Sequence, residues 1–324
     1  MDIAQLYAEL DLQAQPDATL RAQADKLEAH DWSAAELATG CDILDLNPRS
    51  CSELNHLDST LRTWAGIQIT RLCADDFDKN EVGVWPDPLL HHDLARACLA
   101  AVLVSMPTLI TRYQQRGVQP ETLTAVTADI RRWIEAYQRR HDVLGLREIR
   151  WLRYHFAAEL IPLGRLQFNP VHWFGACALG ALELSEGQAC FATHIPATGP
   201  LEPEQVAASF ALAARELPRL WPARADNLLT CVSWLLDPRL RTMLKPGSNL
   251  LAFQAVWDAI VARKGEDRSI LSFIFDRDVP PTDLSEVVAT TSLQRAVWKH
   301  YQNGNYFTGG IGVRRLQRQP APTP

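Results

Sequence analysis

The stretch CFATHIPATGPLEPEQV, residues 190–206, decides the fold of this chain. Its first part alternates apolar and small polar residues up to His194, as a strand does, and Pro203 suits the first position of a helix. The short loop between them contains two prolines and one glycine. A helix N-terminus exposes unpaired N–H groups that favour an anion, above all a phosphate. The stretch therefore predicts either a ligand-binding loop or an ordinary connection between a strand and a helix.

Two kinds of ligand-binding group are available in this stretch. The backbone amides of Ile195, Ala197, Thr198 and Gly199 are the candidate donors to an anionic cofactor. His194, at the end of the predicted strand, is a candidate base because imidazole titrates near neutral pH. The alternative for His194 is a histidine that is simply hydrogen-bonded at the edge of the domain.

The hydrophobic pattern of the sequence changes near residue 144. Before that point the apolar residues recur at helical spacing, for example over 89–116 and 120–137. After it, short β-rich runs alternate with helices, as an α+β domain requires. We expect an all-helical domain over 1–144, a mixed α/β domain over 145–317, and a flexible Pro-rich tail over 318–324.

The pattern of the second half predicts a series of elements. The expected helices cover 148–160, 203–217 and 292–302, with a short one after Pro238, and the expected strands cover 166–173, 176–184, 188–194, 228–236, 269–275 and 306–313.

Composition excludes several functional classes. A net charge of −6 and a pI near 5.9 argue against nucleic acid and acidic membrane surfaces as partners. The longest uninterrupted apolar run, 97–104, is far shorter than the ~20 residues of a membrane span, so we expect no membrane insertion. Seven cysteines without a Cys-x-x-Cys pair predict neither a disulfide framework nor a zinc site, and we expect a cytoplasmic protein that needs no metal.

Two further strands carry candidate substrate-binding residues. In LGRLQFNP, Arg165 and Gln167 share a predicted face and could hold a carboxylate or phosphate; the alternative is a solvated edge strand. In LTCVSWLLDP, Cys231 and Ser233 face one side and Trp234 the other, so they line either a substrate channel or a packed core. Ser233 is not in a Gly-x-Ser-x-Gly turn, which disfavours a hydrolase nucleophile.

The order and wording of these segments resemble a known family. LGRLQF, HIPATGPL, CVSWLLDPRL, SNLLAFQ and TSLQRAVWKHYQNG are similar to the bacterial two-domain acyltransferases that have a helical N-terminal domain and a GNAT-like C-terminal domain. The resemblance implies an α+β fold with a splayed central sheet, in which acyl-CoA lies between two diverging strands and its pyrophosphate on the following loop.

The resemblance assigns roles to the candidate residues. It implies acyl transfer from acyl-CoA, or from an acyl carrier protein, to an amine of a small-molecule or peptide acceptor. His194 would act as the base, with Ser233 on the adjacent splayed strand. Arg165, Gln167 and Trp234 would shape the acceptor or acyl pocket.

Two departures from the family pattern keep other hypotheses open. The loop has a single glycine between prolines instead of two closely spaced glycines, and PRLRTML lacks the tyrosine that often protonates the leaving thiolate. A catalytically inactive GNAT-like module that binds an acyl thioester or a partner protein is therefore the alternative. A thioesterase that uses Ser233 or Cys231 ranks third.

Overall fold

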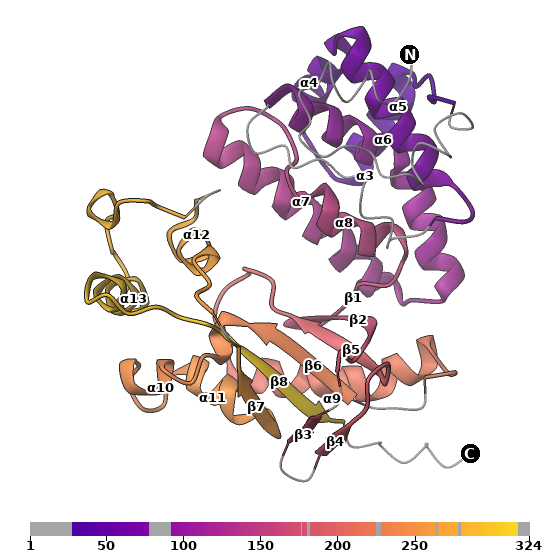
Figure 1. Cartoon of the computed structure of the whole chain (residues 1–324). Coiled ribbons are helices and arrows are strands. Elements are labelled where there is room, and N and C mark those ends of the chain that lie inside the picture. Colours follow the sequence, from indigo (N-terminus) through magenta and orange to yellow (C-terminus); the bar gives the residue numbers. More distant parts are fainter. Residues whose placement is uncertain are drawn as a thin grey trace. The chain divides into compact units, whose positions relative to one another are not determined.

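The computed structural model divides the chain into two compact units, 1–160 and 161–324 (Figure 1). It describes residues 28–77, 92–175, 177–179, 182–224, 228–263, 265–277 and 280–316. The expected tail, 318–324, lies outside the described residues.

The first unit is helical throughout its described part. Its elements are α3 (Ala34–Ile43), α4 (Pro48–Ser52), the 3₁₀ turn η1 (Glu53–His56), α5 (Ser59–Cys73), α6 (His92–Arg116), α7 (Pro120–His141) and α8 (Ile149–Phe156). Helix boundaries follow local chemistry: Ser33 and Glu36 form a capping box at the start of α3, and Pro120 is the first residue of α7.

Helix α6 is the core of this unit. It packs against α3, α5, α7 and α8, and its residues from Leu94 to Val104 are almost all buried. By length and hydropathy alone it is long and apolar enough to cross a membrane, but 67% of its most apolar window is buried inside the protein. Such burial is typical of the central helix of a globular helical domain.

The predicted domain boundary at residue 144 lies too early. Helix α8 packs against α6, and the Tyr113 hydroxyl on α6 donates a hydrogen bond to the Leu160 carbonyl at 2.7 Å. These contacts include 145–160 in the helical unit, so the units divide after Leu160. The sequence places α8 wrongly because its amphipathic pattern does not show which core it packs against.

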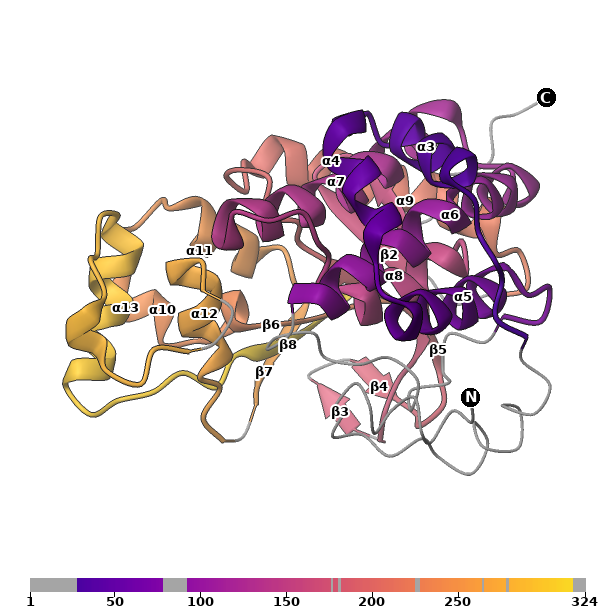
Figure 2. The same ribbon diagram turned by 90° about the horizontal axis from the view of Figure 1, so that it is seen from above.

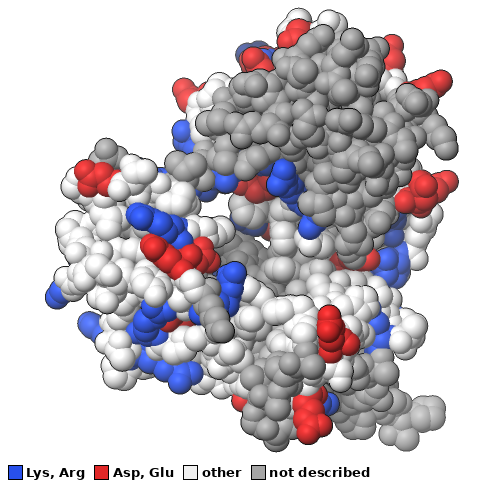
Figure 3. Space-filling view, viewed as in Figure 1, with Lys and Arg blue, Asp and Glu red and all other residues white. Residues whose placement is uncertain are grey.

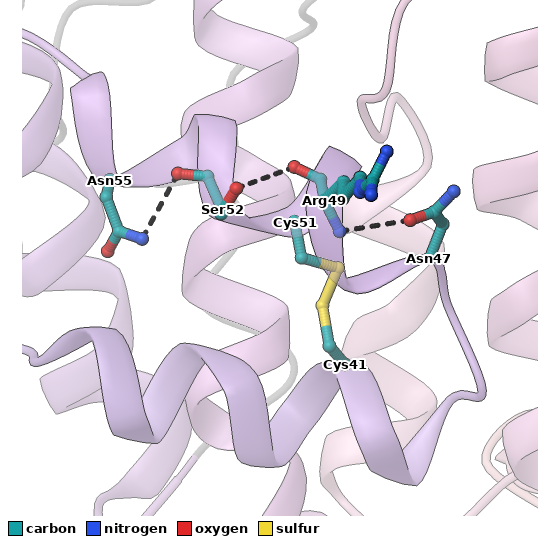
Figure 4. The surroundings of a disulfide bond; sticks show 6 residues. All are labelled: Cys41, Asn47, Arg49, Cys51, Ser52 and Asn55. Carbon is teal, nitrogen blue, oxygen red and sulfur yellow. Dashed lines mark hydrogen bonds between the residues drawn. A yellow bond between two sulfur atoms is a disulfide. The ribbon is translucent and has the colours of Figure 1, made fainter.

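A disulfide joins Cys41 on α3 to Cys51 on α4 (Figure 4). Both residues are buried, and their Cα atoms lie 6.6 Å apart. The prediction that the cysteines form no disulfide framework misses this pair, because the turn between two short helices brings residues ten positions apart into contact. Disulfides are uncommon in reducing compartments, so the cysteines no longer support the cytoplasmic location, which stays a prediction.

The second unit is built on a six-stranded mixed sheet. In the order β1-β2-β5-β6-β8-β7 the strands are Ile161–Leu163, Leu166–His172, Ala189–His194, Leu228–Ser233, Gly310–Arg315 and Ala259–Ala262. A separate hairpin consists of β3 (Cys177–Leu179) and β4 (Leu182–Leu184). The helical segments are α9 (Pro203–Leu220), η4 (Trp234–Leu236), α10 (Leu240–Met243), α11 (Asn249–Ala255), α12 (Ser269–Phe275), η5 (Leu284–Glu286) and α13 (Ser292–Gln302).

Different elements pack on the two faces of this sheet. Helix α9, which the sequence predicts over 203–217, packs against β1 and β2 with its apolar face buried, and Phe210 lies next to Phe168 at 6.5 Å between ring centroids. On the opposite face, the β3–β4 hairpin supplies Leu182 and Leu184 to a core with Cys190 and neighbouring strand residues. Helices α10, α12 and α13 pack together around a separate core beside the sheet (Figure 2).

One predicted strand is wrong. Residues 269–275, SILSFIF, form helix α12 because Ile270 and Leu271 are buried against Val297 of α13 and Phe307. A short apolar run does not distinguish a strand from a buried helix by periodicity alone.

An ion pair is buried between α7 and α8 in the helical unit. The Asp129 carboxylate accepts hydrogen bonds from His155 Nε2 at 3.0 Å and from the Arg132 guanidinium. Burial by itself raises the pKa of Asp129, but the contacts with His155 and Arg132 outweigh it and hold the pKa well below its usual value. A depressed pKa contributes stability above the unfolded value near pH ~4, and that stability is lost as pH falls through the folded value.

We predict that Asp129→Asn lowers the free energy of unfolding of the helical unit by about 3 kcal/mol at neutral pH, because His155 and Arg132 then lack a negatively charged partner. The difference from the wild type should shrink below about pH 4, where the carboxylate begins to protonate in the unfolded chain while the folded protein still holds it charged. Urea denaturation at neutral and at acidic pH measures this difference in the free energy of unfolding. Asp142→Asn, an exposed change at the C-terminal end of the same helix, should alter stability by less than about 0.5 kcal/mol; equal effects of the two variants would contradict the assignment.

Candidate functional site

Strands β5 and β6 separate after two paired positions. Their parallel register joins only Phe191 to Leu229 and Ala192 to Thr230. Each strand nevertheless continues: β5 stays paired with β2 through His194, and β6 stays paired with β8 through Ser233. The predicted splayed sheet is therefore confirmed, and a gap opens between the last residues of the two strands.

Asp237 fixes the far end of β6 against β8. Its buried carboxylate accepts hydrogen bonds from the backbone N–H groups of Thr308 and Gly309 and forms a two-pronged ion pair with Arg239. Burial by itself raises the pKa of Asp237, but these contacts outweigh it and hold the pKa below its usual value. They hold the segment that follows β6 beside β8, on the side away from β5.

His194 lies at the mouth of the gap. It pairs with Gln167, and Asn169 pairs with Ala192, so all four side chains are on the sheet face opposite α9. His194 is half-buried, and its Nε2 lies 2.6 Å from Asn169 Oδ1. Gln167 is buried, with 4% of its surface exposed, and lies next to His194 on the neighbouring strand.

Arg165 holds the loop that follows His194. It lies in the turn before β2, and its guanidinium donates to the carbonyls of Pro196 (2.9 Å), Gly199 (2.7 Å) and Pro200 (3.0 Å). Its backbone N–H donates to the hydroxyl of Ser209 on α9. The predicted shared strand face of Arg165 and Gln167 is wrong, because β2 begins at Leu166, and the contacts of Arg165 make it a support of the loop.

The loop places several backbone amides near the start of α9. Ala197, Thr198 and Gly199 are exposed, and Ile195 is half-buried. The Thr198 amide donates to the Pro196 carbonyl, so it is already used within the loop. Gly199 has φ 107°, which favours glycine. Helix α9 has no side-chain cap at Glu202, so its first amides do not bond to a capping side chain.

The predicted residues on β6 and at the start of η4 have structural contacts. Ser233 Oγ accepts from the Leu235 amide at 3.2 Å and caps η4. Trp234 packs against the core formed with α10, α12 and α13. Cys231 is buried, and burial raises the pKa of its thiol to about 12. These contacts disfavour the thioesterase hypothesis, since neither Ser233 nor Cys231 has the surroundings of an activated nucleophile.

Sequence reasoning missed three polar residues around the gap. Asn169 contacts His194 directly, and its place two residues after Gln167 on one strand was the available signal. Thr230 belongs to the last paired position and Thr193 directly follows it on β5, and each has a buried hydroxyl without a hydrogen-bond partner. Their burial depends on neighbouring strands and could not be predicted locally.

Other candidate sites are less suitable. Within the described ranges, no group of three His, Cys, Asp or Glu residues could hold a metal. A hollow of about 750 Å³ in the helical unit is lined by charged residues, including Asp75, Arg112, Arg116 and Glu159, which do not suit an apolar ligand.

Two family models together match nearly the whole chain. An N-acyltransferase N-terminal domain matches residues 1–158, and a GNAT-like C-terminal domain matches residues 160–314. The chain belongs to the two-domain GNAT-like acyltransferases. The predicted resemblance is thus confirmed, as is the α+β fold with a helical first domain. No curated protein matches the sequence.

Solved structures of acyltransferases share this two-domain fold. An acyltransferase in complex with decanoyl-CoA and teicoplanin has a TM-score of 0.76 and 21% identity, and the match covers 98% of this chain and 100% of that one. An acyltransferase mutant with octanoyl-CoA gives the same values, and a complex with CoA and 10C-teicoplanin has a TM-score of 0.75 with the same identity and coverage.

We predict that Arg165→Ala loosens the loop over 195–201, because three carbonyls lose a charged donor. Hydrogen exchange of the loop amides should accelerate about tenfold, corresponding to ~1.4 kcal/mol for partly exposed bonds. Arg215→Ala, at an exposed arginine on α9 that pairs with its neighbour Glu216, is the matched control. Unchanged exchange in the loop of Arg165→Ala would show that the guanidinium does not hold it.

Proposed function

We propose that this GNAT-like acyltransferase moves an acyl group from acyl-CoA to the amine of a small-molecule or peptide acceptor. The observation that carries the proposal is the gap between β5 and β6 with His194 at its mouth. Similar folds occur in acyltransferases whose structures contain octanoyl-CoA, decanoyl-CoA and teicoplanin, which supports an acyl-CoA donor and an acceptor of that size class.

The gap suits the polar arm of acyl-CoA. Backbone groups on the facing edges of β5 and β6 have no strand partner beyond Ala192 and Thr230, so an extended chain with amide groups can pair with them. The buried hydroxyls of Thr193 and Thr230 also require partners, which a bound ligand would supply. The uncapped N-terminus of α9 and the adjoining loop favour the pyrophosphate.

Acyl transfer to an amine depends more on a general base than on a general acid. The acceptor must lose a proton from its ammonium group before its nitrogen attacks the thioester carbonyl, and His194 is positioned to take that proton. The C–S bond then breaks, CoA leaves as a thiolate, and the second proton of the attacking nitrogen passes to this thiolate or to water. Because a thiol has a pKa near ~8.5, the thiolate leaves without prior protonation, so the missing tyrosine in 238–244 does not prevent acyl transfer.

On the face shown in Figure 3, basic and acidic side chains alternate over the described part of the C-terminal unit and do not form one broad cationic area. An acyl carrier protein remains the alternative donor, and the inactive binding module remains the alternative function.

We predict that acyl-CoA raises the melting temperature of the C-terminal unit, since a ligand that binds only the folded state stabilises it. At about 100 times its Kd the gain is ~2.7 kcal/mol. Thermal shift with acetyl-, octanoyl- and palmitoyl-CoA, with free CoA as control, measures both the site and its preferred chain length. No shift with any thioester would exclude direct acyl-CoA binding and favour a carrier protein as donor.

We predict that His194→Ala lowers acceptor-dependent release of free CoA thiol by about 10² to 10⁴-fold, as expected for loss of a general base. The assay uses octanoyl-CoA with a panel of amines that includes amino sugars, peptides and teicoplanin. His172→Ala, at the exposed end of β2, is the control and should retain activity. Retained turnover in His194→Ala would remove the base assignment, and no turnover of the wild type with any amine would favour the inactive module.

A further inference from the structure

Asn169 is held in one orientation beside His194. Its side chain is buried, with 1% of its surface exposed, on β2. One end of the amide lies 2.6 Å from His194 Nε2, and the Nδ2 end donates to the Pro170 carbonyl at 3.4 Å. A buried amide with contacts at both ends has little freedom to rotate.

These contacts determine which ring nitrogen carries the proton. The Pro170 carbonyl can only accept a hydrogen bond, so the NH₂ group of Asn169 must face it. The amide oxygen of Asn169 then faces the imidazole. Because an amide oxygen can also only accept, His194 Nε2 must be the donor, and the lone pair of the neutral ring lies on Nδ1.

We propose that Asn169 is a positioning residue that keeps His194 in the Nε2-protonated tautomer, so that Nδ1 is the atom that accepts the proton of the amine. The inference rests on the proposed function, in which His194 is the base. When Nδ1 takes the proton, the acceptor nitrogen loses its positive charge and the ring becomes an imidazolium. Nε2–H still donates to Asn169, so the same contact fits both protonation states.

The neutral charge of Asn169 is part of this role. A carboxylate at this position would favour the imidazolium and raise the histidine pKa by about 1–3 units, which would remove the base at neutral pH. An uncharged amide orients the ring without that penalty.

The described part of the sheet around His194 carries little charge. On its face of β1, β2, β5 and β6, the buried thiol of Cys190 is the only other titratable group among the described residues. The hairpin that packs on this face exposes Glu183, and the Arg165 guanidinium is directed at the loop carbonyls. The hydrogen bond that His194 donates to Asn169 is therefore the main polar influence that the sheet provides.

The tautomer can be measured in the wild-type protein without any assay of turnover. Nitrogen NMR of the protein labelled with ¹⁵N-histidine, with the His194→Ala spectrum for assignment, distinguishes a protonated ring nitrogen from one with a lone pair. Above the ring pKa we expect a protonated Nε2 and a lone pair on Nδ1. The opposite tautomer, or an even mixture, would overturn the proposal.

Kinetics of two variants test the consequence for catalysis. Asn169→Ala should lower kcat by about 10-fold or more while the KM for acyl-CoA changes less than about twofold, because ring orientation and not donor binding is lost. Asn169→Asp should shift the acidic limb of the pH profile of kcat/KM to higher pH by about 1 pH unit or more, so that activity recovers at higher pH. An unshifted limb in Asn169→Asp would contradict the proposal.

Val171→Ala is the matched control, since this residue lies on the same strand face two positions further along. It should reduce stability without moving the pH profile or the tautomer. The outcomes separate the two proposals. Full turnover in His194→Ala would overturn the role of His194 as base without affecting the measured tautomer. Loss of turnover in His194→Ala, together with the opposite tautomer in the wild type, would overturn only the positioning role of Asn169.

Discussion

The divergence of β5 and β6 is the constraint on which the site depends. Two adjacent parallel strands normally stay paired, because an unpaired buried backbone group costs free energy. Here each strand keeps a full ladder on its outer side, β5 with β2 and β6 with β8, so only the two facing edges are left without strand partners. The sheet thus remains stable although a polar gap separates the ends of the two strands.

Groups outside the gap keep it open. Asp237 and its bonds to Thr308, Gly309 and Arg239 tie the segment after β6 to the start of β8. Arg165 ties the loop after β5 to the turn before β2. Because both anchors lie on elements that do not line the gap, the backbone edges inside it need no internal support and remain available for binding.

Strand β2 contributes more to the site than its sequence suggests. The polar residues Gln167 and Asn169 alternate with apolar ones and place two amides beside His194 on a buried face. Buried polar groups require partners, and the pairing of β2 with β5 supplies the histidine as a partner for Asn169. The proposed base is therefore oriented by the neighbouring strand and not by its own.

The sequence by itself determined the elements that local patterns encode: the strand up to His194, the loop with Gly199, helix α9 with its buried face, and the helical character of the first unit. Segment-level similarity also identified the family and the splayed sheet. Tertiary structure alone decided that 269–275 is a helix, that Cys41 bonds to Cys51, and that Arg165 holds the loop while Asn169 orients His194. The reason is physical: helix caps, turns and periodicity act between residues a few positions apart, whereas burial, strand register and side-chain partners depend on segments that only the folded chain brings together.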